Sequence, residues 1–405
     1  MAHDPPTGAH PHTTSALPPA PTLLSPFPHK VLTVILAAAS NNARVTCMRV
    51  NSIFYDVAVP HVHHTVKVFR GNGRGDEEDT FPLTGPHAAK LASHVRVLDV
   101  GEHLIGTCRH AHTYTSSFPR LHNMHTLRLR VRDTLDDGTD VFHVFEDVYE
   151  PRVCNLLPPL RPRTLVFRGT GTQTEKLGII DDPERIMTRG PLSSVREVVV
   201  VFEPEVQIYD EGVEVACSLS RVKFAHPVKF TFVFWTKKRG DDWIPARLHH
   251  HVGDDYYDSE DSASAKSHLE AWWLSTLAFL DILFHQPTPE GGAPLLTMVN
   301  AGAIPSVHTV RWTLPSFTPE DTKLSRKELR GKLSIDERAI KLENRFKAWF
   351  DGACDARAPG DTYDGKPWDP ATRDKVQSMR FLSMDEFLAE HNGDVFDEEE
   401  LAGWR

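Results

Sequence analysis

Histidine and cysteine side chains in short clusters are the residues of this sequence best suited to chemistry. Cys108, His110 and His112 occupy alternate positions, so on a strand their side chains would face the same way. Such a trio can hold zinc when a water or a fourth ligand completes the tetrahedron, but the sequence indicates no fourth ligand. A second group, the histidines at 249–251, is followed by the carboxylates of Asp254, Asp255 and Asp258. Neither group has the spacing of a known zinc motif, so we expect no metal or cofactor and leave the first group open.

Motifs of nucleotide binding and covalent catalysis are absent from the sequence. The glycine-containing stretch at 169–176 lacks the GxxxxGK[ST] spacing with which a phosphate-binding loop holds a nucleotide. The chain has no GxSxG sequence, and none of its cysteines lies in a recognisable catalytic context. The sequence therefore predicts a protein that is not an enzyme. An enzyme whose site is assembled from distant segments is the alternative.

The net charge and the cysteine spacing further restrict the class of protein to which this chain can belong. With 45 basic and 55 acidic residues the formal net charge is −10, whereas a general nucleic-acid binder needs a concentrated positive surface. The five cysteines are widely spaced and include no CxxC pair, so we expect reduced thiols in the cytoplasm or nucleus. The longest apolar run, at 31–39, is far shorter than the about 20 residues of a membrane-spanning helix. We expect neither nucleic acid nor membrane as a partner.

Composition changes along the chain and predicts its organisation. Residues 1–26 contain seven prolines among Ser, Thr and Ala and cannot bury enough apolar surface to fold. A helical pattern follows, then a polar, glycine-rich stretch, and then a long region of strands and helices. The predicted divisions are a disordered tail (1–26), a helical module (27–68), a linker (69–91), a repeat domain (92–350) and a C-terminal loop, helix and acidic tail (351–405).

Short runs rich in β-branched residues predict strands, and the nearly continuous apolar sequence at 195–202 is typical of a strand buried on both faces, as in a parallel sheet. The runs are 95–100, 126–131, 141–148, 164–167, 195–202, 228–235 and 307–314. Four Ser-x-x-Glu capping boxes predict helix starts, because Ser and Glu satisfy each other's free backbone N–H groups. They begin at Ser267, Ser325, Ser334 and Ser383. The helix after Ser334 is predicted to end at Gly352, and residues 394–400 to form the acidic tail.

One apolar pattern recurs along the predicted repeat domain, with apolar residues at positions 1, 4, 7 and 9 of each copy. Copies start at residues 92, 121, 159, 192 and 304, the third of them degenerate, and a copy near 225 is shifted in register. Each copy is expected to form a parallel strand and to bury one face against its neighbours. The pattern resembles leucine-rich repeats with longer units than usual. An ordinary α/β domain whose strands share an apolar pattern is the alternative.

The helical module carries a second resemblance. It opens with Phe27 and Pro28 and continues with apolar residues at helical spacing up to Pro60, which is predicted to end the last helix. These apolar residues are Val31, Leu32, Ile35, Leu36, Val50, Phe54 and Val57. Their order is similar to that of the F-box motif, and together with the repeats it resembles fungal F-box-like proteins. Lys30 stands where the motif has Glu, and Ile53 where it has Arg.

The resemblance implies an α/β fold in which a small N-terminal F-box-like helical module precedes a degenerate leucine-rich-repeat-like solenoid with C-terminal helices. It also implies a non-enzymatic adaptor that binds a Skp-type adaptor and its cullin complex and recruits an unidentified target protein to an SCF-type ubiquitin ligase. The residues expected to contact the Skp-type adaptor are Pro28, Leu32, Ile35, Leu36, Val50 and Phe54. A protein-interaction repeat domain without a role in ubiquitin ligation is the alternative.

Overall fold

The computed structural model contains two compact units, one within Met1–Val62 and one within His63–Arg405. The structure describes residues 28–68, 87–101, 121–130, 160–168, 191–202, 224, 226–236, 238–241, 282–289, 293–303, 333–356, 362–363, 366–367, 370–391 and 393–404. The predicted tail at 1–26, the predicted strands at 141–148 and 307–314, and the capping boxes at Ser267 and Ser325 lie outside these residues.

Three helices form the described part of the first unit: α1 (His29–Ala38), α2 (Asn41–Cys47) and α3 (Ser52–Val62). The two later helices begin at polar caps. The Ser40 hydroxyl accepts a hydrogen bond from the Ala43 N–H, and the Asn51 side chain accepts one from the Phe54 N–H. Pro28 precedes α1, where its missing N–H leaves no bond unmade. Both α1 and α2 pack against α3.

The boundaries of α3 differ from the prediction. Pro60 lies inside the helix, which continues to Val62 instead of ending before the proline. Only two residues of α3 follow Pro60. Because proline has no backbone N–H, one hydrogen bond of the helix is missing, and this affects the last turn alone. Val50 lies in the turn before the helix, so the predicted apolar stripe starts outside α3.

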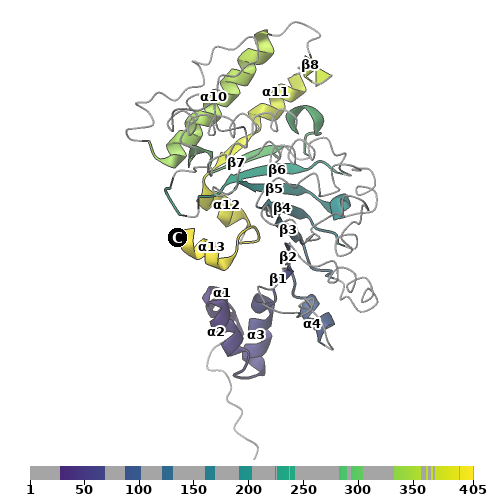
Figure 1. Ribbon diagram of the computed structural model, residues 1–405, viewed down its shortest axis with the longest axis vertical. Helices are drawn as coiled ribbons and strands as arrows, with labels where there is room; N and C mark the ends of the chain where they lie inside the picture. The colour runs from purple at the N-terminus through teal and green to yellow at the C-terminus, as the bar shows by residue number, and fades with distance from the viewer. Residues whose placement is uncertain are drawn as a thin grey trace, which may run out of the picture. The chain divides into compact units, whose positions relative to one another are not determined.

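The second unit is a mixed α/β fold with an eight-stranded sheet in which every neighbouring pair of strands is parallel. From edge to edge the strands follow sequence order (Figure 1). They are β1 (Thr65–Val68), β2 (Val97–Val100), β3 (Thr126–Arg130), β4 (Thr164–Arg168), β5 (Glu197–Phe202), β6 (Lys229–Phe234), β7 (Leu296–Val299) and β10 (Arg380–Leu382). A second sheet pairs β8 (Thr362–Tyr363) with β9 (Lys366–Pro367) in antiparallel orientation.

The strand register places the recurring apolar positions on one face of the sheet. Leu98 pairs with Leu127 and Leu127 with Leu165, and the row continues through Val198, Phe230 and Leu296. All six side chains are at most 1 % exposed. Successive residues of β2, β5 and β6 are buried, so both faces of these strands are covered, which explains why they lack the alternating polar pattern of a half-exposed sheet.

The copy of the apolar pattern near residue 225, predicted to be shifted in register, is in register when it is counted from Phe224. Phe230 and Phe232 pair with Val198 and Val200, as the third and fourth apolar positions of a regular copy would. The Phe224 ring packs edge-on against the Phe230 ring, with centroids 6.1 Å apart. The copy predicted to start at 304 lies outside the described residues.

Three strands were missed in the sequence. β1 lies within the residues predicted to form the helical module, although it pairs with β2. β7 and β10 contain only four and three residues. Runs of this length give too little pattern for a strand prediction. The five predicted strands within described residues are confirmed as β2 to β6, each with shifts of one or two residues at its ends.

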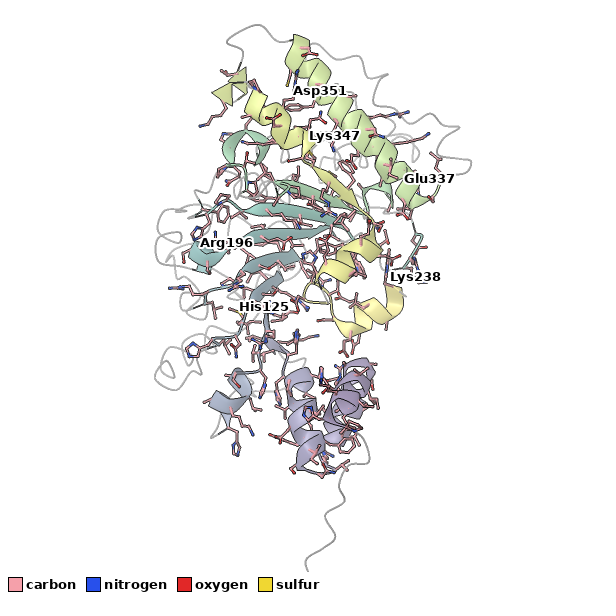
Figure 2. The ribbon with its side chains drawn as sticks, turned by 180° about the vertical axis from the view of Figure 1, so that it is seen from behind. His125, Arg196, Lys238, Glu337, Lys347 and Asp351 are labelled. Atoms are coloured by element: carbon pink, nitrogen blue, oxygen red, sulfur yellow. The ribbon has the colours of Figure 1, made fainter. Side chains whose placement is uncertain are left out.

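Seven labelled helical segments and a short helical stretch at residues 282–285 accompany the sheet in the described part of the second unit. The labelled segments are α4 (Ala88–Ala92), η2 (Pro191–Ser194), η4 (Ala301–Ala303), α10 (Ile335–Ala356), α11 (Pro370–Gln377), α12 (Met384–His391) and α13 (Glu398–Trp404). Two predicted capping boxes are confirmed. The Ser334 N–H donates to Glu337 (2.7 Å) and the Glu337 N–H to the Ser334 hydroxyl (3.2 Å), at the start of α10 (Figure 2). Ser383 and Glu386 repeat this exchange before α12.

α10 does not end at Gly352, as the sequence predicted, but continues to Ala356. A glycine inside a helix costs only about 1 kcal/mol relative to alanine, which packing can outweigh. Here Arg373 on α11 bonds the Asp351 carbonyl (3.2 Å) and the Asp355 carboxylate (2.5 Å), on either side of Gly352. No described helix is long and apolar enough to cross a membrane.

Candidate interaction surfaces

The first candidate surface belongs to the helical unit, and the structure divides the six residues expected to contact a Skp-type adaptor. Leu32 and Leu36 are each 2 % exposed and pack with Val57 and Ala58. Phe54 is partly buried against the same cluster. Leu32 and Leu36 therefore hold the helices of the unit together, and Phe54 packs against them while it stays partly exposed.

The other three predicted contact residues, Pro28, Ile35 and Val50, are exposed. Ile35 is 49 % exposed, and its neighbours Val31 and Val34 are 41 % and 69 % exposed. The spacing i, i+3, i+4 places these three side chains on one side of α1, which we call the α1 face. Exposed apolar side chains that share one side of a helix are typical of a partner-binding site.

Arg44 was not singled out in the sequence, yet it fixes the end of α1. Its side chain is 6 % exposed, Nε donates to the Leu36 carbonyl and Nη2 to the Ala37 carbonyl, both at 2.8 Å. The last carbonyls of a helix have no partner within the helix, so the guanidinium satisfies them. Arg44 lies within α2, eight residues after Leu36, and no local pattern in the sequence points to this contact.

The second candidate surface lies on the sheet, on the face opposite the recurring leucines. Arg128 on β3 and Arg168 on β4 have side chains only 1 % exposed. Val166, Val199 and Val201 share this face with them, because they occupy the same rows of the strand register. We call the surface formed by these five residues the arginine face. In the structure, residues 393–404 of the same chain cover it.

The Arg128 side chain binds the covering segment mainly through the backbone carbonyls of that segment. Nε donates to the Asp394 carbonyl (2.7 Å), and Nη2 donates to the carbonyls of Gly393 (3.0 Å) and Phe396 (3.1 Å). Nη1 pairs with the carboxylate of Asp397 at 2.6 Å and with that of the buried Asp99 at 3.5 Å. A buried guanidinium is tolerated when its donors are paired in this way.

Arg168 binds the side chains of the same segment. Nη1 and Nη2 donate to the two carboxylate oxygens of Glu400 at 2.8 and 2.6 Å, a bidentate arrangement that is among the stronger ion pairs in proteins. Burial alone would raise the pKa of Glu400, but the hydrogen bond and charge of Arg168 lower it. The Arg168 guanidinium also lies 5.1 Å from the centre of the Phe396 ring.

Apolar packing completes the contact between the segment and the sheet. The Phe396 ring stacks on Trp235, with centroids 4.2 Å apart, and Trp404 lies 5.4 Å from the same Trp235 ring. Val395, Phe396 and Trp404 are at most 5 % exposed and belong to one cluster with Val199. The segment is therefore held by charge and by apolar burial together.

Histidine–carboxylate contacts flank the arginine face. His391, the last residue of α12, lies 3.2 Å from both carboxylate oxygens of Glu197, and Lys229 lies 3.0 Å from one of them. Burial would raise the pKa of Glu197, but the hydrogen bond from His391 and the charge of Lys229 outweigh it and lower the pKa to about 2. On another side of the face, His64 and His125 lie 3.7 and 3.5 Å from the Asp394 carboxylate.

The C-terminal acidic residues differ from the sequence expectation. The tail predicted at 394–400 includes the start of α13, and its residues Asp397 and Glu400 are paired with strand arginines. The signal was present as Arg128 and Arg168 in the apolar strand sequences TLRLR and TLVFR, together with an acidic, aromatic segment of opposite charge. Pattern reading could not join them because 232 residues separate Arg168 from Glu400.

Neither histidine cluster considered for metal binding falls within the described residues. Cys108, His110 and His112 lie outside them, as do the histidines at 249–251. In the part of the chain that the structure describes, no group of three or more His, Cys, Asp or Glu side chains is placed to hold a metal ion.

Comparison with known proteins identifies no relative. No family model matches the chain, and no match is found among curated proteins or solved structures.

Proposed function

We propose that this chain is a non-enzymatic adaptor that recruits a target protein to an SCF-type ubiquitin ligase. The helical unit docks on a Skp-type adaptor, which links it to the cullin complex, and the sheet unit binds the target. The resemblance of residues 27–68 to the F-box motif is the starting point of this proposal.

The α1 face is the observation that carries the proposal. Val34 is 69 % exposed and Ile35 49 %, on a unit whose own core already contains Leu32 and Leu36. Burying a side chain of this size in a partner stabilises a complex by about 1.5–3 kcal/mol. The docking set that we propose is Val31, Val34, Ile35 and Val50, with Leu32, Leu36 and Phe54 supporting it from beneath.

The sheet supports the target-binding role. Eight parallel strands in sequence order, with apolar positions recurring in register, are the arrangement expected of a leucine-rich-repeat-like solenoid. We propose this finer description of the fold for residues 92–350, which contain six of the eight strands, β2 to β7. Repeat folds of this kind bind proteins along the extended surface of their strands.

Lys30 favours a second candidate, a protein-interaction repeat domain with no role in ubiquitin ligation. It is exposed in the first turn of α1, directly before Val31, and its charge is opposite to that of the Glu in the F-box motif. A reversed charge at the rim of an interface slows association and lowers affinity when the partner expects the other sign. In this case the sheet unit would still bind its target.

A pull-down with an immobilised, purified fungal Skp-type adaptor tests the proposal. The immobilised adaptor should retain the full-length chain but should not retain the double variant Val34→Asp/Ile35→Asp. The affinity should fall more than about tenfold, because two carboxylates would be buried without partners in an apolar contact.

Asn41→Asp/Asn42→Asp is the matched control, because it adds the same charge at exposed positions of α2. This variant should be retained as well as the unmodified chain. Failure of the unmodified chain to bind would contradict the ligase role and favour the second candidate. Retention of the Val34→Asp/Ile35→Asp variant at full strength would exclude the α1 face as the docking surface.

A further inference from the structure

The segment at 393–404 contacts the arginine face as a bound peptide would. Arg128 captures three of its backbone carbonyls, those of Gly393, Asp394 and Phe396, which any peptide would supply. Gly393 has φ of 79°, a left-handed conformation that favours glycine, so the chain turns sharply as it leaves α12 and enters this contact.

Three side chains of the segment give the contact its chemical selectivity. The Phe396 ring centroid lies 5.1 Å from the Arg168 guanidinium and 4.2 Å from the Trp235 ring centroid. Asp397 pairs with Arg128 at 2.6 Å and with Lys67 at 2.8 Å, and Glu400 pairs with Arg168 through both oxygens. The pattern that this face recognises is therefore an aromatic residue followed by carboxylates one and four positions later.

The contact is also open to water at its charged rim. The side chains of Asp397 and Glu400 are 16 % and 25 % exposed, and that of Lys67 is 46 % exposed. On the outer side of α13, Glu398 and Glu399 are exposed. A contact of this kind can open locally while the sheet beneath it stays folded.

We propose that the arginine face is a binding site for acidic, aromatic peptide segments, and that residues 393–404 occupy it until a target segment of the same chemistry replaces them. The inference rests on the proposed function, since it names the class of target that the sheet unit recruits. Removal of the segment would leave Arg128 beside Asp99, and Arg168 without the Glu400 carboxylate, next to three valines. This surface is complementary to an acidic segment with one large apolar residue.

Fluorescence anisotropy with a labelled synthetic peptide of sequence GDVFDEEELAGW, that of residues 393–404, tests the proposal on the full-length chain. The variant Glu400→Lys weakens the attachment of the chain's own segment, because the new charge faces Arg168. It should bind the peptide at least about tenfold more tightly than the unmodified chain does. A peptide carrying Phe396→Ala and Asp397→Ala should not bind.

Glu390→Lys is the matched control, because it makes the same charge change at an exposed position of α12 away from the arginine face. It should bind the peptide no better than the unmodified chain. The proposal is overturned if Glu400→Lys gives no gain over this control, or if the altered peptide binds equally well.

Hydrogen exchange on the unmodified chain tests the proposal without any substitution. Amides of α13 should exchange at least about tenfold faster than those of β4 and β5, because the segment must open before the sheet unfolds. Equal protection would mean that the segment opens only with the core, and this would overturn the proposal. Neither experiment contains a Skp-type adaptor, so the result does not depend on whether the helical unit docks.

Discussion

Arg128 combines five contacts in one buried guanidinium: three backbone carbonyls and the carboxylates of Asp99 and Asp397. Asp99 is 0 % exposed, so each charge of the pair depends on the other and on the covering segment. Breaking such a pair by removing one partner leaves a charge and several carbonyls with fewer hydrogen bonds in a dry environment.

Arg128→Met should therefore lower the free energy of unfolding by about 3–5 kcal/mol. Urea unfolding followed by circular dichroism measures the change. Arg380→Met is the control, because Arg380 pairs with Glu390 at an exposed position and its loss should cost at most about 1 kcal/mol. Equal effects of the two substitutions would show that burial of Arg128 does not matter energetically.

Glu197 makes stability depend on pH, because its pKa is lowered from the usual 4.5 to about 2. A carboxylate with a lowered pKa stabilises the folded state above its unfolded pKa, and this stabilisation disappears as the pH falls towards the folded pKa. The contribution of this group, about 3 kcal/mol, should be lost between pH 5 and pH 2. Unfolding free energies measured across this range should fall more steeply for the unmodified chain than for Glu197→Gln.

Glu390→Gln is the control for this measurement, since it removes an exposed carboxylate and should leave the pH dependence unchanged. The pKa of Glu400 is also lowered, so the unfolding free energy of the Glu197→Gln variant should still decrease somewhat as the pH falls. Identical slopes for Glu197→Gln and the unmodified chain would contradict the role assigned to the His391 and Lys229 contacts.

At the level of elements, α1 presents two sides with opposite tasks. Leu32 and Leu36 face α3, whereas Val31, Val34 and Ile35 face away from the core of the unit. Apolar spacing in the sequence indicates that α1 is amphipathic, but so many of its residues are apolar that it cannot show which side is internal. The distinction depends on how α2 and α3 pack, which three short helices do not reveal from their sequence alone.

Leu36→Asp should unfold the helical unit, because it places a carboxylate in the cluster with Val57 and Ala58. The loss of stability should be about 3 kcal/mol or more, against about 0.5 kcal/mol for Ile35→Asp at an exposed position of the same helix. Hydrogen exchange of the amides of α1 to α3 in the full-length chain separates the two. Equal protection in both variants would contradict the assignment of Leu36 to the core.

Element prediction succeeded where local chemistry decides the structure. The capping boxes at Ser334 and Ser383 and the strands β2 to β6 follow from patterns within a few residues. The ends of α3 and α10 did not follow, because Pro60 is tolerated in the last turn of α3 and contacts from α11 outweigh the preference of Gly352. The short strands β7 and β10 depend on pairing with β6 and with each other, which lies beyond local sequence.

At the scale of the whole molecule, the chain divides its candidate surfaces between two units. The α1 face belongs to the helical unit and the arginine face to the sheet unit, so substitutions in one surface leave the residues of the other unchanged. Of the six docking residues expected from the F-box resemblance, three are exposed, Phe54 is partly buried, and Leu32 and Leu36 are internal. The arginine face escaped prediction because it joins residues of β3 and β4 to a segment more than 200 residues away.

Titration calorimetry of the full-length chain with a purified fungal Skp-type adaptor tests the central proposal most directly. We expect saturable binding with one adaptor per chain. The Val34→Asp/Ile35→Asp variant should not bind, whereas the affinity of Glu400→Lys should be unchanged, because residue 400 lies in the other unit. Absence of binding by the unmodified chain, or equal loss of affinity in both variants, would contradict the assignment of adaptor docking to the α1 face.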